Sequence, residues 1–245
     1  MVSVWSPNCV AAATSSHLSP VVLFLRALTG AVLLMAVPVH AQAFNYPSMQ
    51  LPTASVRDYT GVVAGGGGTT MLLQWREGAG AGQHIGFDAG FADPRNSSSM
   101  RFFVGAAGGR ELLRSTTSQP VDVMLTAGAS ATLGGGSTLF RVPVGVSAGH
   151  TFELDQEMTV TPFVHPRLSL DMCNRCGGEG TGRSEVSLNF DLGANFRINH
   201  EFAVRAAMSF SGSNLAGSDG ALGVGFGWTP SAVSGKQQRL GASPR

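Results

Sequence analysis

The strongest constraint in this chain is a two-residue alternation of apolar and polar side chains. It is clearest over 184–198, where every second residue is apolar and the residues between them are polar or glycine. Successive side chains of a β-strand point to opposite faces, so this segment has one apolar face and one polar face. The apolar set is Val186, Leu188, Phe190, Leu192, Ala194, Phe196 and Ile198. A tilted strand of this length is long enough to cross a lipid bilayer.

The same alternation recurs along most of the chain. Clear strands are predicted over 83–92, 99–108, 120–132, 138–149, 157–170, 184–198, 201–211 and 219–228. Two earlier segments, 56–64 and 68–76, alternate less regularly and are separated by Gly65–Gly68. Because bacterial single-chain barrels have even strand numbers, the count is ten if both segments belong to the sheet and eight if neither does. The expected fold class is all-β, a closed antiparallel up-and-down transmembrane β-barrel of about ten strands, with eight as the alternative.

Composition agrees with a β-fold and excludes some functions. The chain has 33 glycines and only 13% charged residues, and after residue 43 it shows no sustained helical period. Lys236 is the only lysine, which is unusual for a surface that faces water. The net charge of +1 predicts no nucleic-acid partner.

The N-terminal residues are predicted to be a signal peptide over 1–43. The apolar run Ala27–Val39 follows Arg26 and is too short to span a bilayer as a helix, and Ala41 and Ala43 supply the small residues of a cleavage site. An uncleaved anchor is the alternative. Residues 1–20 carry no Lys or Arg, which a misassigned start codon would explain, and Cys9 would then have no role. The remaining divisions are an extended lead-in at 44–55, the barrel at 56–228 and a disordered periplasmic tail at 229–245.

The polar face indicates which side of the barrel faces lipid. A soluble lipocalin-like barrel would place the apolar face inward, whereas a membrane barrel places it outward. Mid-strand charges fall on the polar face throughout, and these form the predicted lumen-facing network: Asp88, Arg101, Asp122, Arg141, Arg167, Asp191, Arg197 and Arg205. Aromatic residues fall near strand ends, as in membrane-interface girdles. The predicted outer ring is Phe91, Phe102, Phe140 and Phe210, and the predicted inner ring is Trp75, Phe196, Phe202 and Trp228.

Taken together, the pattern over 56–228 resembles the small bacterial outer-membrane β-barrel proteins, the group that includes the transmembrane domain of outer-membrane protein A. The most specific part is the final strand Gly220–Trp228, which looks like the aromatic-terminated strand read by the barrel assembly machinery. The tail 229–245 departs from this pattern, because family members commonly end at the aromatic residue. The resemblance implies an outer-membrane location, with the bilayer, lipopolysaccharide and the assembly machinery as partners.

Few residues suggest chemistry. Cys173 and Cys176 in the loop 171–183 are interpreted as a disulfide, because two further zinc ligands or a redox-type helix are not evident nearby. His84 and His165 fall on the polar face, and Ser169 shares that face with His165. Four residues along a strand span about 13 Å, so His165 and Ser169 are out of hydrogen-bond reach.

The sequence therefore predicts a non-enzymatic barrel without metal or cofactor, with a structural, interaction or narrow-pore role. In so narrow a barrel the lumen charges are expected to form a plug rather than an ion pathway. The alternatives are an outer-membrane lipid-modifying enzyme that uses His84 or His165, and a soluble secreted barrel that holds an apolar ligand. The oligomeric state is left open.

Overall fold

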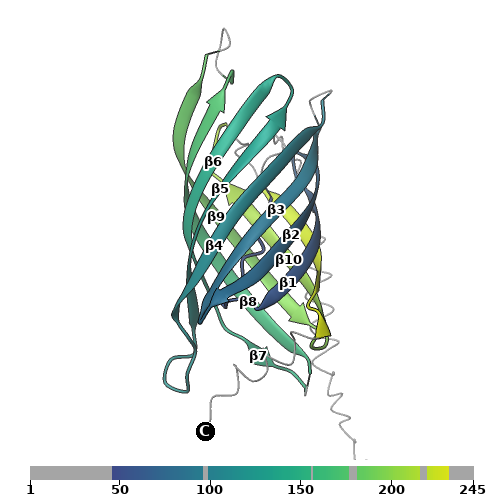
Figure 1. Cartoon of the computed structure of the whole chain (residues 1–245), viewed down its shortest axis with the longest axis vertical. Coiled ribbons are helices and arrows are strands. Elements are labelled where there is room, and N and C mark those ends of the chain that lie inside the picture. The colour runs from purple at the N-terminus through teal and green to yellow at the C-terminus, as the bar shows by residue number, and fades with distance from the viewer. Residues whose placement is uncertain (1–45, 96–98, 156, 177–180, 216–219, 232–245) are drawn as a thin grey trace, which may run out of the picture. The chain divides into compact units, whose positions relative to one another are not determined.

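The computed structural model describes residues 46–95, 99–155, 157–176, 181–215 and 220–231. Within them the chain forms eleven antiparallel strands (Figure 1). These are β1 (Arg57–Gly65), β2 (Gly68–Gly80), β3 (Gln83–Pro94), β4 (Arg101–Leu113), β5 (Asp122–Gly134), β6 (Ser137–Gly149), β7 (Phe152–Glu153), β8 (Thr159–Asn174), β9 (Arg183–Arg197), β10 (Phe202–Ser211) and β11 (Ala221–Trp228). The predicted signal peptide with Cys9, and residues 232–245 of the predicted tail, lie outside the described residues.

Ten of the strands in this described part of the chain close into a barrel. From β1 to β6 and from β8 to β11, each strand pairs with the next strand in sequence. β6 pairs with β8, and β11 pairs with β1. The two-residue β7 adds only to the start of β8. The expectation of a closed antiparallel ten-strand barrel is confirmed, and the eight-strand alternative is wrong because 56–64 and 68–76 enter the sheet as β1 and β2. None of the described residues lies in a helix long and apolar enough to span a membrane.

Several strands are longer than their alternation predicts. β2 continues to Gly80, β4 to Leu113 and β8 to Asn174, in each case because backbone pairing with the neighbouring strands continues beyond the regular pattern. Consequently, the predicted loop 171–183 shortens to residues 175–182. The predicted connection 109–119 moves to residues 114–121.

The hairpin between β5 and β6 turns in two residues. Gly135 and Gly136 have φ of +62° and +76°, and Gly134 before them has φ of +144°. Two consecutive positive φ angles match the right-handed twist of the flanking strands, and residues with a β-carbon adopt them reluctantly. This glycine run thus fixes the register between the two strands.

The two faces of the sheet are reversed relative to a water-soluble barrel. On β9, the apolar Val186 and Leu188 are 72% and 64% exposed, whereas the polar Ser187 between them and Asn189 after them are 3% and 1% exposed. The same outward apolar and inward polar pattern holds along β1, β2 and β11. The alternative of a soluble barrel with an apolar interior is therefore not what the chain forms.

Two names for the ends of the barrel are used below. The terminal end carries Arg57, where β1 begins, and Trp228, where β11 ends. The disulfide end carries the bonded pair Cys173, near the end of β8, and Cys176, just after it. In Figure 1 the strands slant steeply between these two ends, as closure of a barrel requires.

Glycines on the inner wall make room for large side chains inside the barrel. A β-carbon on Gly193 would come within 2.6 Å of both Phe163 Cζ and Ala207 Cβ. Phe163 and Ala207 belong to an apolar cluster inside the barrel, together with Met49, Val62, Leu72 and Phe103. The small residues of the wall and the bulky residues opposite them are therefore complementary.

The first prediction concerns this complementarity. Gly193→Ala is expected to destabilise the folded barrel by about 1–3 kcal/mol, because the added methyl group overpacks the Phe163 contact. Gly65→Ala is the matched control, since a β-carbon there meets nothing within 4 Å. Urea unfolding followed by tryptophan fluorescence measures both, and equal stabilities of the two variants would contradict the packing argument.

Candidate functional site

The lumen is occupied by the chain's own N-terminal segment. Residues 46–52, called the plug below, run inside the barrel and adopt no strand conformation in the described residues. Met49, Pro47 and Pro52 are fully or almost fully buried. The sequence predicted only an extended lead-in over 44–55, of which 46–55 are described, and did not place it inside the barrel.

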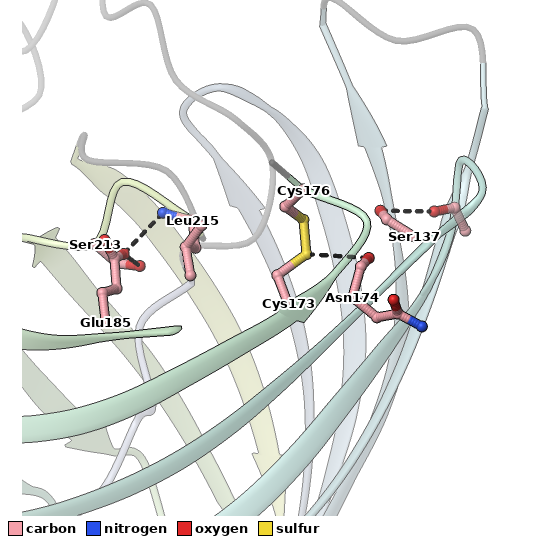
Figure 2. The surroundings of a disulfide bond; sticks show 8 residues. Ser137, Cys173, Asn174, Cys176, Glu185, Ser213 and Leu215 are labelled. Atoms are coloured by element: carbon pink, nitrogen blue, oxygen red, sulfur yellow. Dashed lines mark hydrogen bonds between the residues drawn. A yellow bond between two sulfur atoms is a disulfide. The ribbon is translucent and has the colours of Figure 1, made fainter. Parts of the chain in front are cut away.

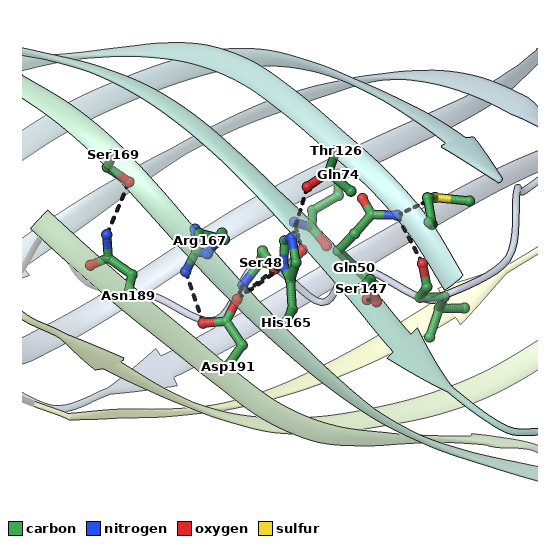
Figure 3. A network of polar contacts seen from close by, with 12 residues as sticks. Ser48, Gln50, Gln74, Thr126, Ser147, His165, Arg167, Ser169, Asn189 and Asp191 are labelled. Atoms are coloured by element: carbon green, nitrogen blue, oxygen red, sulfur yellow. Dashed lines mark hydrogen bonds and ion pairs between the residues drawn. The ribbon is translucent and has the colours of Figure 1, made fainter. Parts of the chain in front are cut away.

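Ser48 holds the plug at mid-barrel (Figure 3). Its hydroxyl donates to Asp191 Oδ2 at 2.7 Å and lies 2.8 Å from Nδ1 of His165. Its carbonyl oxygen accepts a hydrogen bond of 3.1 Å from Gln74 Nε2. Gln74, His165 and Asp191 each lie near the middle of their strands β2, β8 and β9, so the plug reaches the centre of the lumen.

Gln50 attaches the plug to β3, β5 and β6. Its carbonyl oxygen accepts a hydrogen bond of 2.8 Å from the Ser147 hydroxyl on β6. Its side-chain amide donates to Met124 Sδ on β5 at 3.3 Å and lies 3.4 Å from His84 Nε2 on β3. The plug thus contacts strands on several sides of the barrel.

Apolar contacts complete the seating of the plug. Met49 is 2% exposed within the interior cluster, and the ring of Tyr46 stacks on Phe103 with centroids 4.9 Å apart. A β-carbon on Gly223 would meet Met49 Cε at 3.0 Å and Pro47 Cγ at 3.2 Å, so glycine permits this approach. Met49 itself has φ of +50°, a left-handed conformation that costs a non-glycine residue roughly 1–2 kcal/mol. Tertiary contacts must offset this strain.

Among the described residues, four arginine–aspartate ion pairs on the inner wall surround the plug. They are Arg76–Asp88 at 2.6 Å, Arg141–Asp171 at 2.6 Å, Arg167–Asp191 at 2.8 Å and Arg205–Asp58 at 2.7 Å. The carboxylates of Asp171 and Asp191 are completely buried, and Arg141 binds Asp171 through two parallel hydrogen bonds. Each pair joins two strands of the wall, so the charges are compensated without help from the plug.

The structure places the eight residues of the predicted network on the inner face, in different roles. Asp88, Arg141, Arg167, Asp191 and Arg205 take part in the ion pairs above. Asp122 instead accepts a 2.7 Å hydrogen bond from the Ser115 backbone in the β4–β5 connection. Arg101 and Arg197 are half-buried on β4 and β9.

Sequence reasoning missed three charged partners and the whole plug. Asp58 and Arg76 lie on the two strands with weak alternation, and Asp171 was assigned to a loop although it belongs to β8. All three occupy polar positions when the alternation is continued along their strands, and this could have placed them in the lumen. For Ser48 and Gln50 the two flanking prolines were the only cue, and they indicate an irregular segment without saying where it lies.

The two histidines are buried beside the plug rather than placed at a rim. His165 is 2% exposed, with Nε2 lying 2.8 Å from Thr126 Oγ1 and Nδ1 facing Ser48. Ser169, as expected, does not reach His165 and instead accepts from Asn189 Nδ2 at 2.9 Å. In a hydrolytic triad the serine donates to the histidine, whereas the Ser48 hydroxyl donates directly to Asp191. This arrangement anchors the plug and does not prepare a nucleophile.

A small cavity remains beside the plug. It has a volume of about 90 Å³, with Tyr46, Ser48 and Gln50 on the plug side. The opposite side is formed by small residues of β4 and β5, among them Gly105 and Gly128. A volume of this size accommodates a few water molecules. No group of three or more potential metal-ligating residues occurs in the part of the chain that the structure describes.

The disulfide end is ordered by the bonded cysteines and by Glu185 (Figure 2). Cys173 and Cys176 form a disulfide, and Cys173 packs with Leu139 and Leu215. Glu185 on β9 accepts hydrogen bonds from the Ser213 hydroxyl at 2.5 Å and the Leu215 backbone at 2.8 Å. These contacts hold the start of the β10–β11 connection against the inner wall.

Aromatic side chains form a continuous row on the outer face near the terminal end. Direct cross-strand partners connect Phe87, Trp75, Tyr59, Trp228 and Phe202 across five adjacent strands. Tyr59 stacks on Trp228 and Trp75 stacks on Phe87, at centroid distances of 5.6 and 5.4 Å. Of the other predicted girdle residues, Phe196 also lies near this end. Phe91, Phe102, Phe140 and Phe210 are exposed on the outer face toward the disulfide end.

An apolar exterior, a polar interior and a closed sheet define the class as a transmembrane β-barrel. Among solved structures, the chain is similar to a bacterial polysaccharide outer membrane secretin, with 11% identity and a TM-score of 0.45 over 66% of this chain. It spans 57% of the length of that secretin chain. It is also similar to the KdgM porin, with 8% identity and a TM-score of 0.37 over 71% of this chain and 99% of the porin.

A third similar structure is Ail, the attachment invasion locus protein of Yersinia pestis. It has 13% identity and a TM-score of 0.30 over 70% of this chain and 93% of Ail. No protein-family model and no curated protein matches the chain. The class therefore rests on the strand pairing and face chemistry described above, and the finer likeness to outer-membrane protein A stays a prediction.

The second prediction tests the buried ion pairs. Asp191→Ala is expected to destabilise the barrel by about 3–5 kcal/mol, because it leaves the Arg167 guanidinium buried without its partner. The double variant Arg167→Met with Asp191→Leu should lose less than the single variant, since no lone charge remains. Glu77→Ala is the control, because the Arg57–Glu77 pair is partly exposed and should contribute much less to stability than the buried pair. A double variant worse than the single one would contradict this reasoning.

The third prediction concerns the disulfide. The Cys173–Cys176 bond closes a loop with a sequence separation of only 3, and the chain-entropy relation then gives about 2 kcal/mol of stabilisation. Replacing both cysteines with serine should lower the free energy of unfolding by that amount without preventing folding. Reductant should produce the same change in the wild-type protein and none in the variant. A variant that fails to fold would show that the bond does more than close its own loop.

Proposed function

We propose that this protein is an integral outer-membrane barrel whose lumen is closed at rest, and that it serves a structural or interaction role without catalysis. The observation that carries the proposal is the reversed distribution of side chains. Large apolar residues such as Leu73, Val186 and Leu188 are 71%, 72% and 64% exposed around the barrel. In water this surface would be an aggregation hazard, whereas in lipid it is the required exterior.

The positions of the β1 start, the β11 end and the aromatic residues support an orientation. With the terminal end toward the periplasm, the Tyr59–Trp228 row lies at the inner interface and the phenylalanines toward the disulfide end lie at the outer one. The disulfide end would then meet lipopolysaccharide in the outer leaflet. β11 pairs with β1 and ends at Trp228, as expected of a strand recognised by the barrel assembly machinery. Export through the predicted signal peptide over 1–43 belongs to the same proposal.

The lumen favours a structural or interaction role over an open pore. The plug and the ion pairs occupy the interior, and the cavity beside the plug measures about 90 Å³. A lipid-modifying enzyme receives no support from His84 and His165, because both are 2% exposed inside the barrel and face the plug instead of lipid. Partners would therefore meet the connections at the disulfide end.

Membrane fractionation with gel electrophoresis of boiled and unboiled samples tests the proposal directly. A closed membrane barrel should be recovered with the outer membrane and should migrate differently before and after boiling. A protein recovered in the aqueous fraction without detergent and without a boiling shift would overturn the membrane assignment.

The fourth prediction uses one substitution at two positions. Leu188→Arg, in the middle third of β9, is expected to cost roughly 2–4 kcal/mol in phospholipid vesicles because the charge would face lipid. Leu154→Arg is the control, since Leu154 is 57% exposed in the connection before β8 at the terminal end. Urea unfolding in vesicles measures the difference. Similar stabilities for the two variants would mean that Leu188 does not face lipid.

A further inference from the structure

The plug occupies a lumen whose wall is complete without it. We propose that the barrel is a conduit for small ions and hydrophilic solutes, and that residues 46–52 close it and must leave the lumen before solute passes. This activity goes beyond the structural role proposed above but rests on the same membrane-inserted barrel.

The wall charges support a conduit because they are paired within the wall. Arg76 binds Asp88 across β2 and β3, and Arg167 binds Asp191 across β8 and β9. Arg205 donates to Asp58 and Thr60 and reaches Asn195, all on wall strands. Departure of the plug would therefore leave these charges with their partners on the wall, and the exposed wall would carry paired charges beside the apolar side chains of the interior cluster.

One section of the inner wall is formed by small residues. Gly105, Ala107, Gly128 and Ser130 on β4 and β5 border the cavity of about 90 Å³. Tyr46 and Ser48 border the same cavity from the plug side. Removing the plug would join its own volume to this cavity along the small-residue arc, and this is where the conduit would run.

The plug is held by hydrogen bonds that water can replace. It is held by side-chain hydrogen bonds from Ser48 and to Gln50, and it shares no β-ladder with the wall over 46–51 of the described residues. Water can replace such bonds when the plug leaves. Release also relieves the left-handed backbone of Met49, while the burial of the Met49 side chain opposes release. In this proposal the plugged state is the resting state, and the strained Met49 lies at its centre.

The residues that follow the plug are hydrogen-bonded to the rim of the barrel. The plug could therefore leave the lumen and remain attached to the barrel. The Ala54 backbone donates to Glu111 Oε1 at 2.8 Å, and the carbonyl oxygen of Val56 accepts from Gly78 at 2.8 Å. These bonds lie at the terminal end, after the plug and before β1. They would serve as the hinge about which residues 46–52 swing out of the lumen.

The fifth prediction is tested by single-channel recording in planar lipid bilayers with potassium chloride as the probe. The wild-type protein should show brief openings from a closed baseline. Deletion of residues 46–52 should give a sustained current at least tenfold above the wild-type time average. Met49→Ser keeps the backbone but removes the apolar anchor, and it should raise the open fraction about tenfold. Met100→Ser is the matched control, since Met100 is 49% exposed ahead of β4, and it should behave like wild type.

Each outcome decides between named alternatives. A deletion variant that keeps the boiling shift but passes no more current than wild type would show that the lumen is not a conduit. A second outcome is that the deletion variant conducts while neither the wild type nor Met49→Ser ever opens. That result would show that the plug seals the lumen permanently, and it would overturn the proposed release. If the deletion prevents folding, an unchanged open fraction in Met49→Ser overturns the proposal by itself. Loss of the boiling shift in the wild type would instead count against the membrane barrel.

Discussion

Pairing of β11 with β1 joins residues 222–228 to residues 59–65 and leaves every barrel strand with a neighbour on both sides in the described residues. Backbone donors and acceptors are thereby satisfied within the sheet, which is what a chain in lipid requires. Closure also separates the two faces of every strand into an outside and an inside. The apolar phase of the alternation then becomes one continuous outer surface, and the polar phase becomes a lumen.

The interior that closure creates is filled by complementary sizes and charges. Glycines such as Gly193 and Gly223 leave room for Phe163 on the wall and for Met49 on the plug. Ion pairs between strands of the wall hold buried charges in pairs, so the interior tolerates them. Because the wall satisfies itself in this way, the plug can be bound by a few contacts of its own, and this separation of roles underlies the proposed conduit.

Much of the architecture was predictable because local pattern and final environment agree. The alternation over 184–198 identifies β9 apart from one residue at each end, and the polar phase of other strands contains the charges of Asp88 and Arg205. The prediction of strand ends was less accurate where backbone pairing extends a strand beyond its apolar–polar alternation. Asp171 follows the last clear alternation of β8, so it was assigned to a loop although backbone bonds to β6 and β9 keep it in the sheet.

By itself, the sequence determined which side chains share a face and that the charges lie opposite the apolar face, and it limited the number of strands to eight or ten. These properties follow from the two-residue period, which is local. Only the tertiary structure decided which arginine pairs with which aspartate and where residues 46–52 lie. Ser48 meets Asp191 across a separation of 143 residues, and no period in the sequence relates them. Their contact exists because closure of the sheet brings distant strands around one lumen, where an irregular segment can bind.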